Sequence, residues 1–400
     1  DGKIKLLNKK SVNNIMSDNE NTNDDQIKSF YGDSDLSLPD DLLVPDVEDA
    51  KSLKVSVIED DVEGSFKFCF LGAGQGGSRI AEAFSKLGYN RVAALNTAEQ
   101  DLNTVNLEKK LCIGGGGAGK DPEVAKKRIE EHSEDVIDFM RYSFGDSFDR
   151  IFVCAGAGGG SGSGMTIPLV HLAKEVQELS GVTEKKVGVI LTLPKKSEGD
   201  KVGKNAGQVL RNVYALAREG VVSPLIILDN EKVAQLYPNV AISKFWNVAN
   251  SNFTGLFHLF NLTSAKDSSY SSFDRNDYKS ILNSGMIVFG AAPVKNWEDS
   301  VAIARTVREN LKSNLLSGGV DVSSGTTAGV IMIGGTEVLD SLPQSYIDRS
   351  LDQLNRMLKA GSTVHGGVYS GDKPTLNIFS VVGGLAEPTE RLKELMGVRY

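Results

Sequence analysis

A run of glycines directly after an apolar strand is the feature that most constrains this chain. Residues 155–164 hold six glycines and two serines, between the apolar segment Ile151–Cys154 and a helical pattern from Met165 to Leu179. Glycine costs backbone entropy and adds no packing, so a glycine run makes sense where the backbone must approach something closely. A strand that ends in glycines and opens a helix directs free N–H groups at one point, which suits a phosphate. A flexible linker is the alternative, but linkers rarely lie between a strand and a helix.

Composition narrows the class of protein. The chain has 400 residues, enough for about two or three domains, and is 40% apolar and 24% charged, as in ordinary soluble globular proteins. Its net charge of −8, without a basic stripe, argues against direct nucleic-acid binding. No run of about 18 apolar residues occurs, so we expect no membrane span and a cytoplasmic location. The cysteines lie in or beside apolar runs, typical of reduced core residues, and the histidines lack metal-ligand spacing, so no metal ligands are predicted.

The first 63 residues differ from the rest. Between Ser17 and Ala50 the sequence has eleven Asp or Glu residues and one Lys, with Asn, Ser and Pro between them. This composition predicts a disordered or draped extension, residues 1–63. Its short apolar islands, Phe30-Tyr31 and Leu42–Val44, are candidates for docking on a neighbouring subunit or an adaptor.

From Phe66 onward, short apolar strands alternate with helical patterns. This order predicts an α/β fold with a doubly wound parallel sheet that is covered on both faces. The glycine run, which suits a phosphate, makes it a candidate nucleotide-binding sheet. A long helix and a smaller mixed α+β C-terminal domain follow. The expected strands are 66–71, 91–95, 150–154, 186–193, 225–228, 286–289, 329–333 and 376–381; the expected helices are 77–87, 122–142, 162–179, 202–218, 242–262, 300–315 and 344–358.

Two further glycine-rich loops follow predicted strands. Gly72–Gly77 satisfies the dinucleotide fingerprint G-x-G-x-x-G, but an NAD site also needs an acidic residue at the end of the next strand, where Asn96-Thr97 stands. Gly114–Asp121 nearly matches a P-loop, except that Asp121 replaces the hydroxyl that binds Mg²⁺. Its amides can still hold phosphates, and Pro122 behind an Asp cap is a good helix start.

The loop Thr192–Gly199 carries more polar groups. Lys195 and Lys196 are candidates for phosphate contacts and Glu198 for a ribose hydroxyl, unless the loop is simply an exposed charged turn. At the end of the next strand, Asn230 could read the edge of a purine.

In combination, these loops resemble the tubulin/FtsZ superfamily of self-assembling GTPases. Gly158-Gly159-Gly160-Ser161-Gly162-Ser163-Gly164 is similar to the family signature G-G-G-T/S-G-S/T-G, and Gly72–Gly77, Asn96-Thr97 and Gly117–Val124 support it in the same order. The resemblance covers residues 65–294 well and the remainder by element order alone. It implies GTP or GDP with Mg²⁺ as cofactors. The candidate nucleotide-binding residues are Gly74, Gln75, Gly76, Asn96, Gly117, Ala118, Gly119, Gly158, Gly159, Gly160, Ser161, Gly162, Glu198, Asn230, Trp246 and Asn250.

Two of these residues come from the predicted long helix. Asn250 falls where the family has a base-contacting asparagine, and Trp246 and Phe253 lie nearby as candidate stacking rings. Core packing is the equally favoured role of the two aromatic residues.

The segment Phe273–Tyr278 looks like the family's catalytic loop. Asp274 and Asp277 occupy its two acidic positions, three residues apart at a helix start, so both carboxylates can face one way. In the family this loop reaches the γ-phosphate held by the adjoining subunit. Alternatively, Asp274 only caps the helix. The family's asparagine is replaced by Ser272, and its arginine after the Glu-Gly of the preceding loop is replaced by Val202, between Lys201 and Lys204.

The resemblance implies a head-to-tail homopolymer with a hydrolysis site shared between subunits. The predicted division is an extension (1–63), a GTP-binding domain (64–240), a central helix and catalytic loop (241–283), an activation domain (284–386) and a tail (387–400). The acidic extension is unlike a typical bacterial FtsZ and favours a divergent phage- or plasmid-type relative, in a bacterial host cytoplasm. A scaffold that hydrolyses GTP slowly and an NAD-dependent oxidoreductase are the alternatives.

Overall fold

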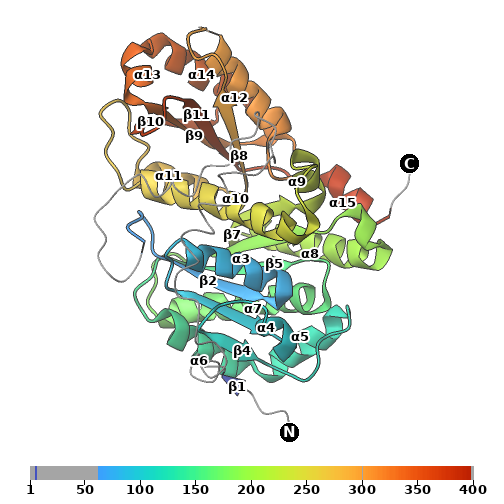
Figure 1. Cartoon of the computed structure of the whole chain (residues 1–400). Coiled ribbons are helices and arrows are strands. Elements are labelled where there is room, and N and C mark those ends of the chain that lie inside the picture. Colours follow the sequence, from blue (N-terminus) through green and yellow to red (C-terminus); the bar gives the residue numbers. More distant parts are fainter. Residues whose placement is uncertain (1–4, 7–61, 300, 398–400) are drawn as a thin grey trace, which may run out of the picture.

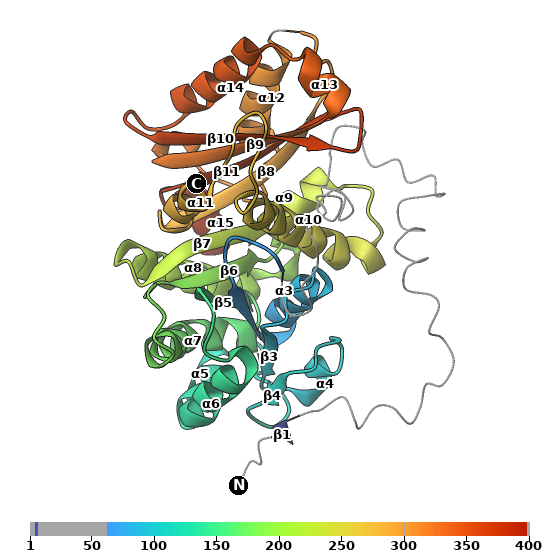
Figure 2. The same cartoon turned by 90° about the vertical axis from the view of Figure 1, so that its left-hand side faces the viewer.

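The structure is a computed structural model that describes residues 5–6, 62–299 and 301–397. In these residues eleven strands form one sheet in the order β1-β4-β3-β2-β5-β6-β7-β8-β11-β9-β10 (Figures 1 and 2). The strands are β1 (Lys5–Leu6), β2 (Phe68–Ala73), β3 (Val92–Asn96), β4 (Lys110–Cys112), β5 (Arg150–Gly156), β6 (Val187–Leu193), β7 (Val222–Asp229), β8 (Met286–Val294), β9 (Thr327–Gly335), β10 (Thr363–Gly371) and β11 (Leu376–Gly383).

The sheet changes character along its width. From β4 to β8 every neighbouring pair is parallel, as expected for strands joined through helices. Beyond β8 the sheet is mixed, because β11 runs antiparallel to both β8 and β9, and β10 is parallel to β9. The predicted α/β class, with a parallel sheet followed by a smaller mixed part, is confirmed.

Helices cover both faces of this sheet. They are α3 (Gly74–Lys86), α4 (Glu99–Leu102), α5 (Pro122–Glu131), α6 (Ser133–Phe144), α7 (Gly160–Leu179), α8 (Asp200–Arg218), α9 (Asn230–Leu236), α10 (Ile242–Thr263), α11 (Arg275–Leu282), α12 (Ala302–Ser313), α13 (Thr336–Ser341), α14 (Gln344–Met357) and α15 (Thr389–Leu395). In Figure 1, α10 crosses the molecule between the parallel part of the sheet and the mixed part. Its 22 residues correspond to about 33 Å, so α10 joins distant points.

The two faces of β2 bury different kinds of side chain. Cys69 and Leu71 point into a mainly aliphatic core, whereas Phe68 and Phe70 join an aromatic cluster with residues of α3 and α10. Phe70 stacks on Phe84 of α3 with ring centroids 3.7 Å apart. Burial of each such ring contributes about 1.5–3 kcal/mol, so this cluster fixes α3 and α10 against the sheet. Cys69 and the other two cysteines are buried and unbridged, as predicted.

Several elements differ from the prediction. The single helix predicted over 122–142 is two helices, separated at His132, whose backbone is not helical. The next residues, Ser133-Glu134-Asp135, supply the acidic first turn that favours a new helix start. The short elements β4, α4, α9 and α13 and the strand β10 were not expected, because they are brief or, in β10, interrupted by glycines that mask strand periodicity. The predicted extension 1–63 lies outside the described residues, except for β1 and residues 62–63.

Candidate nucleotide site and hydrolysis loop

A cavity of about 520 Å³ opens at the carboxyl ends of the parallel strands. Its wall includes Ala73 at the end of β2, Gly156 at the end of β5 and Thr192 near the end of β6, the edge at which open α/β sheets bind ligands. The volume lies within the usual range for small-molecule sites. Fourteen of the sixteen predicted nucleotide-binding residues line it: Gln75, Gly76, Gly117, Ala118, Gly119, Gly158, Gly159, Gly160, Ser161, Gly162, Glu198, Asn230, Trp246 and Asn250.

Glycines allow the elements around the cavity to touch. A Cβ at Gly162 would collide with the carbonyl oxygen of Gly156, and one at Gly160 would lie 2.8 Å from the backbone nitrogen of Asp121. Gly74 has φ +67°, and its Cβ would lie 2.8 Å from the Gly162 nitrogen. The three glycine-rich stretches therefore meet backbone to backbone, which no larger residue permits. Gly74 belongs to this joint and does not line the cavity.

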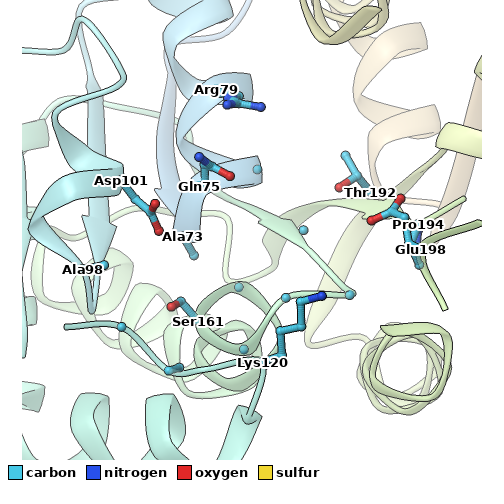
Figure 3. Close-up of a pocket in the computed structure, with 18 of the residues that line it drawn as sticks. Ala73, Gln75, Arg79, Ala98, Asp101, Lys120, Ser161, Thr192, Pro194 and Glu198 are labelled. Atoms are coloured by element: carbon cyan, nitrogen blue, oxygen red, sulfur yellow. The ribbon is translucent and has the colours of Figure 1, made fainter. Parts of the chain in front are cut away.

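Helix N-termini converge on the cavity. Gln75 and Gly76 come from the first turn of α3, and Gly160, Ser161 and Gly162 from the first turn of α7. Neither helix has a side-chain cap, so their first amides are free to bind an anion. Figure 3 shows Gln75 above this region and Ser161 and Lys120 below it.

The P-loop-like segment ends in the predicted way. The Asp121 side chain accepts a hydrogen bond from the Glu123 amide at 3.1 Å, and Pro122 occupies the first turn of α5. Lys120, at φ +60°, lines the cavity with its neighbours Gly119 and Ala118. The Asp121 carboxylate is thus engaged in helix capping, and this loop offers backbone amides and a lysine to a ligand.

Asn96 is not part of the cavity wall, contrary to its predicted role in ligand contact. It is fully buried, its Oδ1 accepts the Thr97 amide at 2.8 Å, and its Nδ2 donates to Asp101 Oδ2 at 3.2 Å. Asp101 lines the cavity, and the Thr97 hydroxyl lies 2.8 Å from the Ser161 hydroxyl. Asn96 therefore shapes the wall from behind.

The part of the cavity wall that does not come from the glycine-rich loops includes two amide side chains and an indole. Asn230 follows β7, while Trp246 and Asn250 lie one turn apart on α10, and all three line the space. Phe253, in contrast, is fully buried in the aromatic core, so of the two aromatic candidates only Trp246 can contact a ligand.

The two lysines of the loop before α8 do not line the cavity. Lys195 Nζ lies 3.6 Å from the centroid of the Phe245 ring, and Lys196 Nζ pairs with Glu394 at 3.3 Å. The exposed-turn interpretation therefore describes them better than phosphate contact. Glu198 does line the cavity, and its Oε1 accepts the Lys195 amide at 2.7 Å.

Arg391 was not among the predicted site residues, but it supports two walls of the cavity from the C-terminal helix α15. Its side chain is 4% exposed and donates to Asp229 through Nε at 2.8 Å and Nη2 at 2.9 Å, and to the Pro194 carbonyl at 2.7 Å. Pro194 lines the cavity, and Asp229 caps α9 next to Asn230. Burial raises the pKa of the Asp229 carboxyl, and the Arg391 guanidinium partly offsets that rise.

Asp274 and Asp277 lie beyond the amino ends of the parallel strands, whereas the cavity lies at their carboxyl ends. Asp274 caps α11 by accepting the Asn276 and Asp277 amides at 2.7 and 2.9 Å. Between them in sequence, Arg275 bonds the Ser65 carbonyl and the Asp149 carboxylate, which precede β2 and β5. The cavity lies at the other end of these strands, and the six residues of β2 alone span about 20 Å. The two aspartates therefore cannot reach a ligand in their own chain's cavity.

Both departures from the family pattern have local roles. The Ser272 hydroxyl accepts the Ser268 amide at 2.9 Å and closes the loop before α11. Val202 is buried, and a Cβ on Gly158 would collide with it, so this side chain packs directly under the glycine-rich loop. Neither Lys201 nor Lys204 lines the cavity.

A glycine-built cavity at the carboxyl ends of parallel strands, with the amide side chains of Asn230 and Asn250 in its wall, defines the class of nucleotide-binding α/β proteins. Residues 67–238 match the Tubulin/FtsZ family, GTPase domain. This segment, 172 of the 400 residues, is similar to the tubulin/FtsZ superfamily.

Individual relatives agree with this assignment. The chain is 26% identical over 250 residues to the tubulin-like protein TubZ of Bacillus cereus, a match that covers 57% of this chain and 55% of that protein. It is also 26% identical to the cell division protein FtsZ 1 of Pyrococcus woesei over 72% of this chain and 75% of that one. Among solved structures, a GTPγS-bound protofilament of CetZ2 from Haloferax volcanii has a TM-score of 0.68 and 26% identity, covering 83% of this chain and 97% of that chain.

Two further features concern the described part of the chain. No helix there has the length and hydropathy needed to cross a membrane. No group of three or more His, Cys, Asp or Glu residues in it is arranged to hold a metal ion.

Proposed function

We propose that this chain binds GTP and hydrolyses it within a head-to-tail filament of its own copies, each site being completed by the next subunit. The observation that carries the proposal is the separation of the cavity from the Asp274–Asp277 loop. The cavity lies at the carboxyl ends of the parallel strands and the loop at their amino ends, about 20 Å or more apart along β2. Stacking two copies end to end would bring the loop of one to the cavity of the other, and such heterologous contacts form open filaments. The GTPγS-bound protofilament of CetZ2 supports this arrangement.

We assign the ends of the nucleotide from the chemistry of the wall. The free amides of α3, α7 and the Gly117–Gly119 loop would hold the phosphates, with Lys120 adding positive charge. Trp246 would stack on the base, and Asn230 and Asn250 would bond its edge. Glu198 would bond a ribose hydroxyl.

Magnesium fits this donor set as a phosphate-bound ion. Because Mg²⁺ keeps several waters and usually takes one or two carboxylates plus substrate phosphates, a dedicated protein cage is not required. Asp101 and Glu198 are the acidic side chains among the residues that line the cavity, and with Glu198 assigned to the ribose, Asp101 would supply the protein oxygen. When bound, the ion would neutralise charge on the phosphates.

In the proposed reaction, the Asp274–Asp277 loop of one subunit orients the water that attacks the γ-phosphate bound by the other. Phosphoryl transfer needs positioning and charge stabilisation more than covalent chemistry, and the bound amides and fixed carboxylates provide these. The predicted division into residues 64–240, 241–283 and 284–386 is part of this proposal: the first binds nucleotide, and the second connects it to the hydrolysis loop.

The test uses Asp274→Asn and Asp277→Asn, with phosphate release and light scattering followed at increasing protein concentration. Asn caps helices as well as Asp does, so the first change removes a charge and keeps the cap. We expect wild-type release to rise steeply above a threshold concentration. Each variant should lose it about a hundredfold, because it removes a group that acts on the attacking water, while its filaments persist.

Release that is proportional to protein concentration and untouched by both changes would refute the shared site. Filament formation with negligible release from the wild type would favour the scaffold alternative. Thermal shifts with GTP, ATP and NAD test the ligand: stabilisation by NAD alone would support the oxidoreductase alternative instead.

A further inference from the structure

We propose that His365 is a positioning residue that fixes the Asp277 carboxylate for hydrolysis in the adjoining subunit; the inference rests on the function proposed above. His365 Nδ1 lies 2.7 Å from Asp277 Oδ1. The other carboxylate oxygen, Oδ2, accepts the Asp274 backbone amide at 3.0 Å. Both oxygens are therefore held, one by the loop itself and the other by a strand about 90 residues further along the chain.

The strand that carries His365 is the edge of the sheet. β10 pairs only with β9 among the described strands, so its outer edge offers unpaired backbone groups. The segment before α11 takes up that edge: the Val368 amide donates to the Ser271 carbonyl at 2.8 Å, and the Ser271 hydroxyl donates to the Gly366 carbonyl at 3.2 Å. β10 is thus a platform for the hydrolysis loop.

Tyr369 secures the same platform from inside. Its buried hydroxyl accepts the Phe273 amide at 2.9 Å and donates to the Thr263 carbonyl, 3.0 Å away, at the end of α10. A Cβ on Gly367 would lie 2.8 Å from Phe273 Cβ, so the loop sits closely on the strand. Because the loop and strand are in fixed register, His365 is brought to Asp277 and to no other acidic residue of the loop.

The surroundings of His365 leave it one polar partner. Its side chain is 16% exposed, its ring meets the Phe273 ring at a centroid distance of 6.5 Å, and the buried Nε2 has no hydrogen-bond partner among the described residues. The bond to Asp277 is therefore the interaction that the imidazole contributes. A residue needed only for packing would not have to place a ring nitrogen toward the carboxylate.

The two aspartates consequently differ. Asp274 is exposed, and both hydrogen bonds that it accepts as helix cap go to Oδ1. Asp277 is half-buried and held at both oxygens. The geometry assigns a fixed orientation to Asp277, set by His365, and leaves Asp274 Oδ2 to meet the group that the neighbouring subunit presents.

The experiment compares His365→Leu with His365→Asn in the full chain. Leu fills similar space without a donor, whereas the Asn amide nitrogen can take the place of Nδ1. We expect His365→Leu to lower phosphate release per assembled subunit about tenfold at saturating GTP. Without its bond to His365, the Asp277 carboxylate is no longer held in place, and a small displacement of a group in the site slows the reaction. The nucleotide affinity of the unassembled protein should change less than about twofold, since His365 does not line the cavity. His365→Asn should restore most of the rate.

The controls separate this inference from the proposed function. His171→Leu changes an exposed histidine on α7 outside the nucleotide cavity and should leave release unchanged. If Asp277→Asn abolishes release but His365→Leu does not lower it, the inference is wrong and the proposed function stands. Equal losses in the Leu and Asn variants would show a packing role and also overturn it. If Asp277→Asn has no effect, the shared site itself is wrong.

Discussion

The cavity end of the sheet, at the carboxyl ends of the parallel strands, is built mainly from backbone. The loop end, at their amino ends around Asp274 and Asp277, is built from side chains. At the cavity, three glycine-rich stretches touch through atoms such as the Gly162 nitrogen, and uncapped helix amides face the space. At the loop end, Arg275 reaches Ser65 and Asp149, and His365 reaches Asp277. A backbone site tolerates almost no added atom, while a side-chain site can lose one partner and keep its fold. The two ends should therefore respond differently to substitution.

The largest effect is expected where the cavity end does depend on one side chain, Arg391. Arg391→Leu leaves the Asp229 carboxylate buried without its cationic partner. We expect the variant to lose about 3–5 kcal/mol of unfolding free energy, the usual cost of breaking a buried ion pair. Because burial already raises the pKa of Asp229, the carboxyl of the variant should hold its proton at low pH. The stability deficit should then grow as the pH rises and that proton is lost. Denaturant unfolding at pH 5 and pH 8, with and without GTP, measures this.

A matched control lies on the same helix. Lys393 and Glu390 form an exposed ion pair at 3.1 Å, and Lys393→Ala should change stability by less than about 1 kcal/mol. If both variants lose equal stability, Arg391 does not support the cavity and the helix as a whole is simply marginal.

The next largest effect tests the backbone-built joint directly. Gly162→Ala places a methyl group against the Gly156 carbonyl, and overpacking of this kind costs about 1–3 kcal/mol. GTP affinity should fall with stability, since the same shift separates the first turn of α7 from the loop after β5. Gly159→Ala is the paired change, because its Cβ meets nothing within 4 Å. Thermal unfolding without nucleotide should distinguish the two variants; equal losses would contradict the joint.

A smaller loss of stability is expected at the loop end. Arg275→Ala removes an ion pair to Asp149 at 2.9 Å and the contact of the guanidinium with the Phe66 ring, 4.2 Å from its centroid. The Arg275 side chain is 51% exposed, so the loss should be about 1 kcal/mol. GTP binding to the unassembled protein should be unchanged, while assembly-linked phosphate release falls. Weaker GTP binding in this variant would show that the two ends are coupled within one chain.

The same contrast explains how far the sequence could be read. The cavity depends on local pattern: glycines after a strand and Pro122 behind Asp121 predict their own geometry from neighbouring residues. A local pattern does not say which of several partners a polar side chain takes. Lys195 turns to Phe245 on the distant helix α10, whereas Asn96 bonds within its own loop, to Thr97 and Asp101. No sequence spacing connects Arg391 to Asp229 or His365 to Asp277, because only the folded sheet brings them together.

The smallest prediction concerns Glu184, at the loop end beside Arg150. Burial raises the pKa of the Glu184 carboxyl, but Arg150 at 3.2 Å, the Lys186 amide and the Asn283 side chain together hold it below its usual value. A lowered pKa means that this carboxylate stabilises the fold above its unfolded pKa, and that the stabilisation is lost as the pH falls through the folded value. The wild type should therefore lose stability between about pH 5 and pH 3 that Glu184→Gln does not lose. The carboxylate is partly solvent-screened, so the difference should stay below about 1 kcal/mol, measured by denaturant unfolding along the pH series.

Since Arg150 also donates to the Leu282 carbonyl at 3.1 Å, acid should loosen the end of α11 before it affects the glycine-built cavity. Amide exchange that opens α7 before α11 at pH 4 would reverse the order of the two ends.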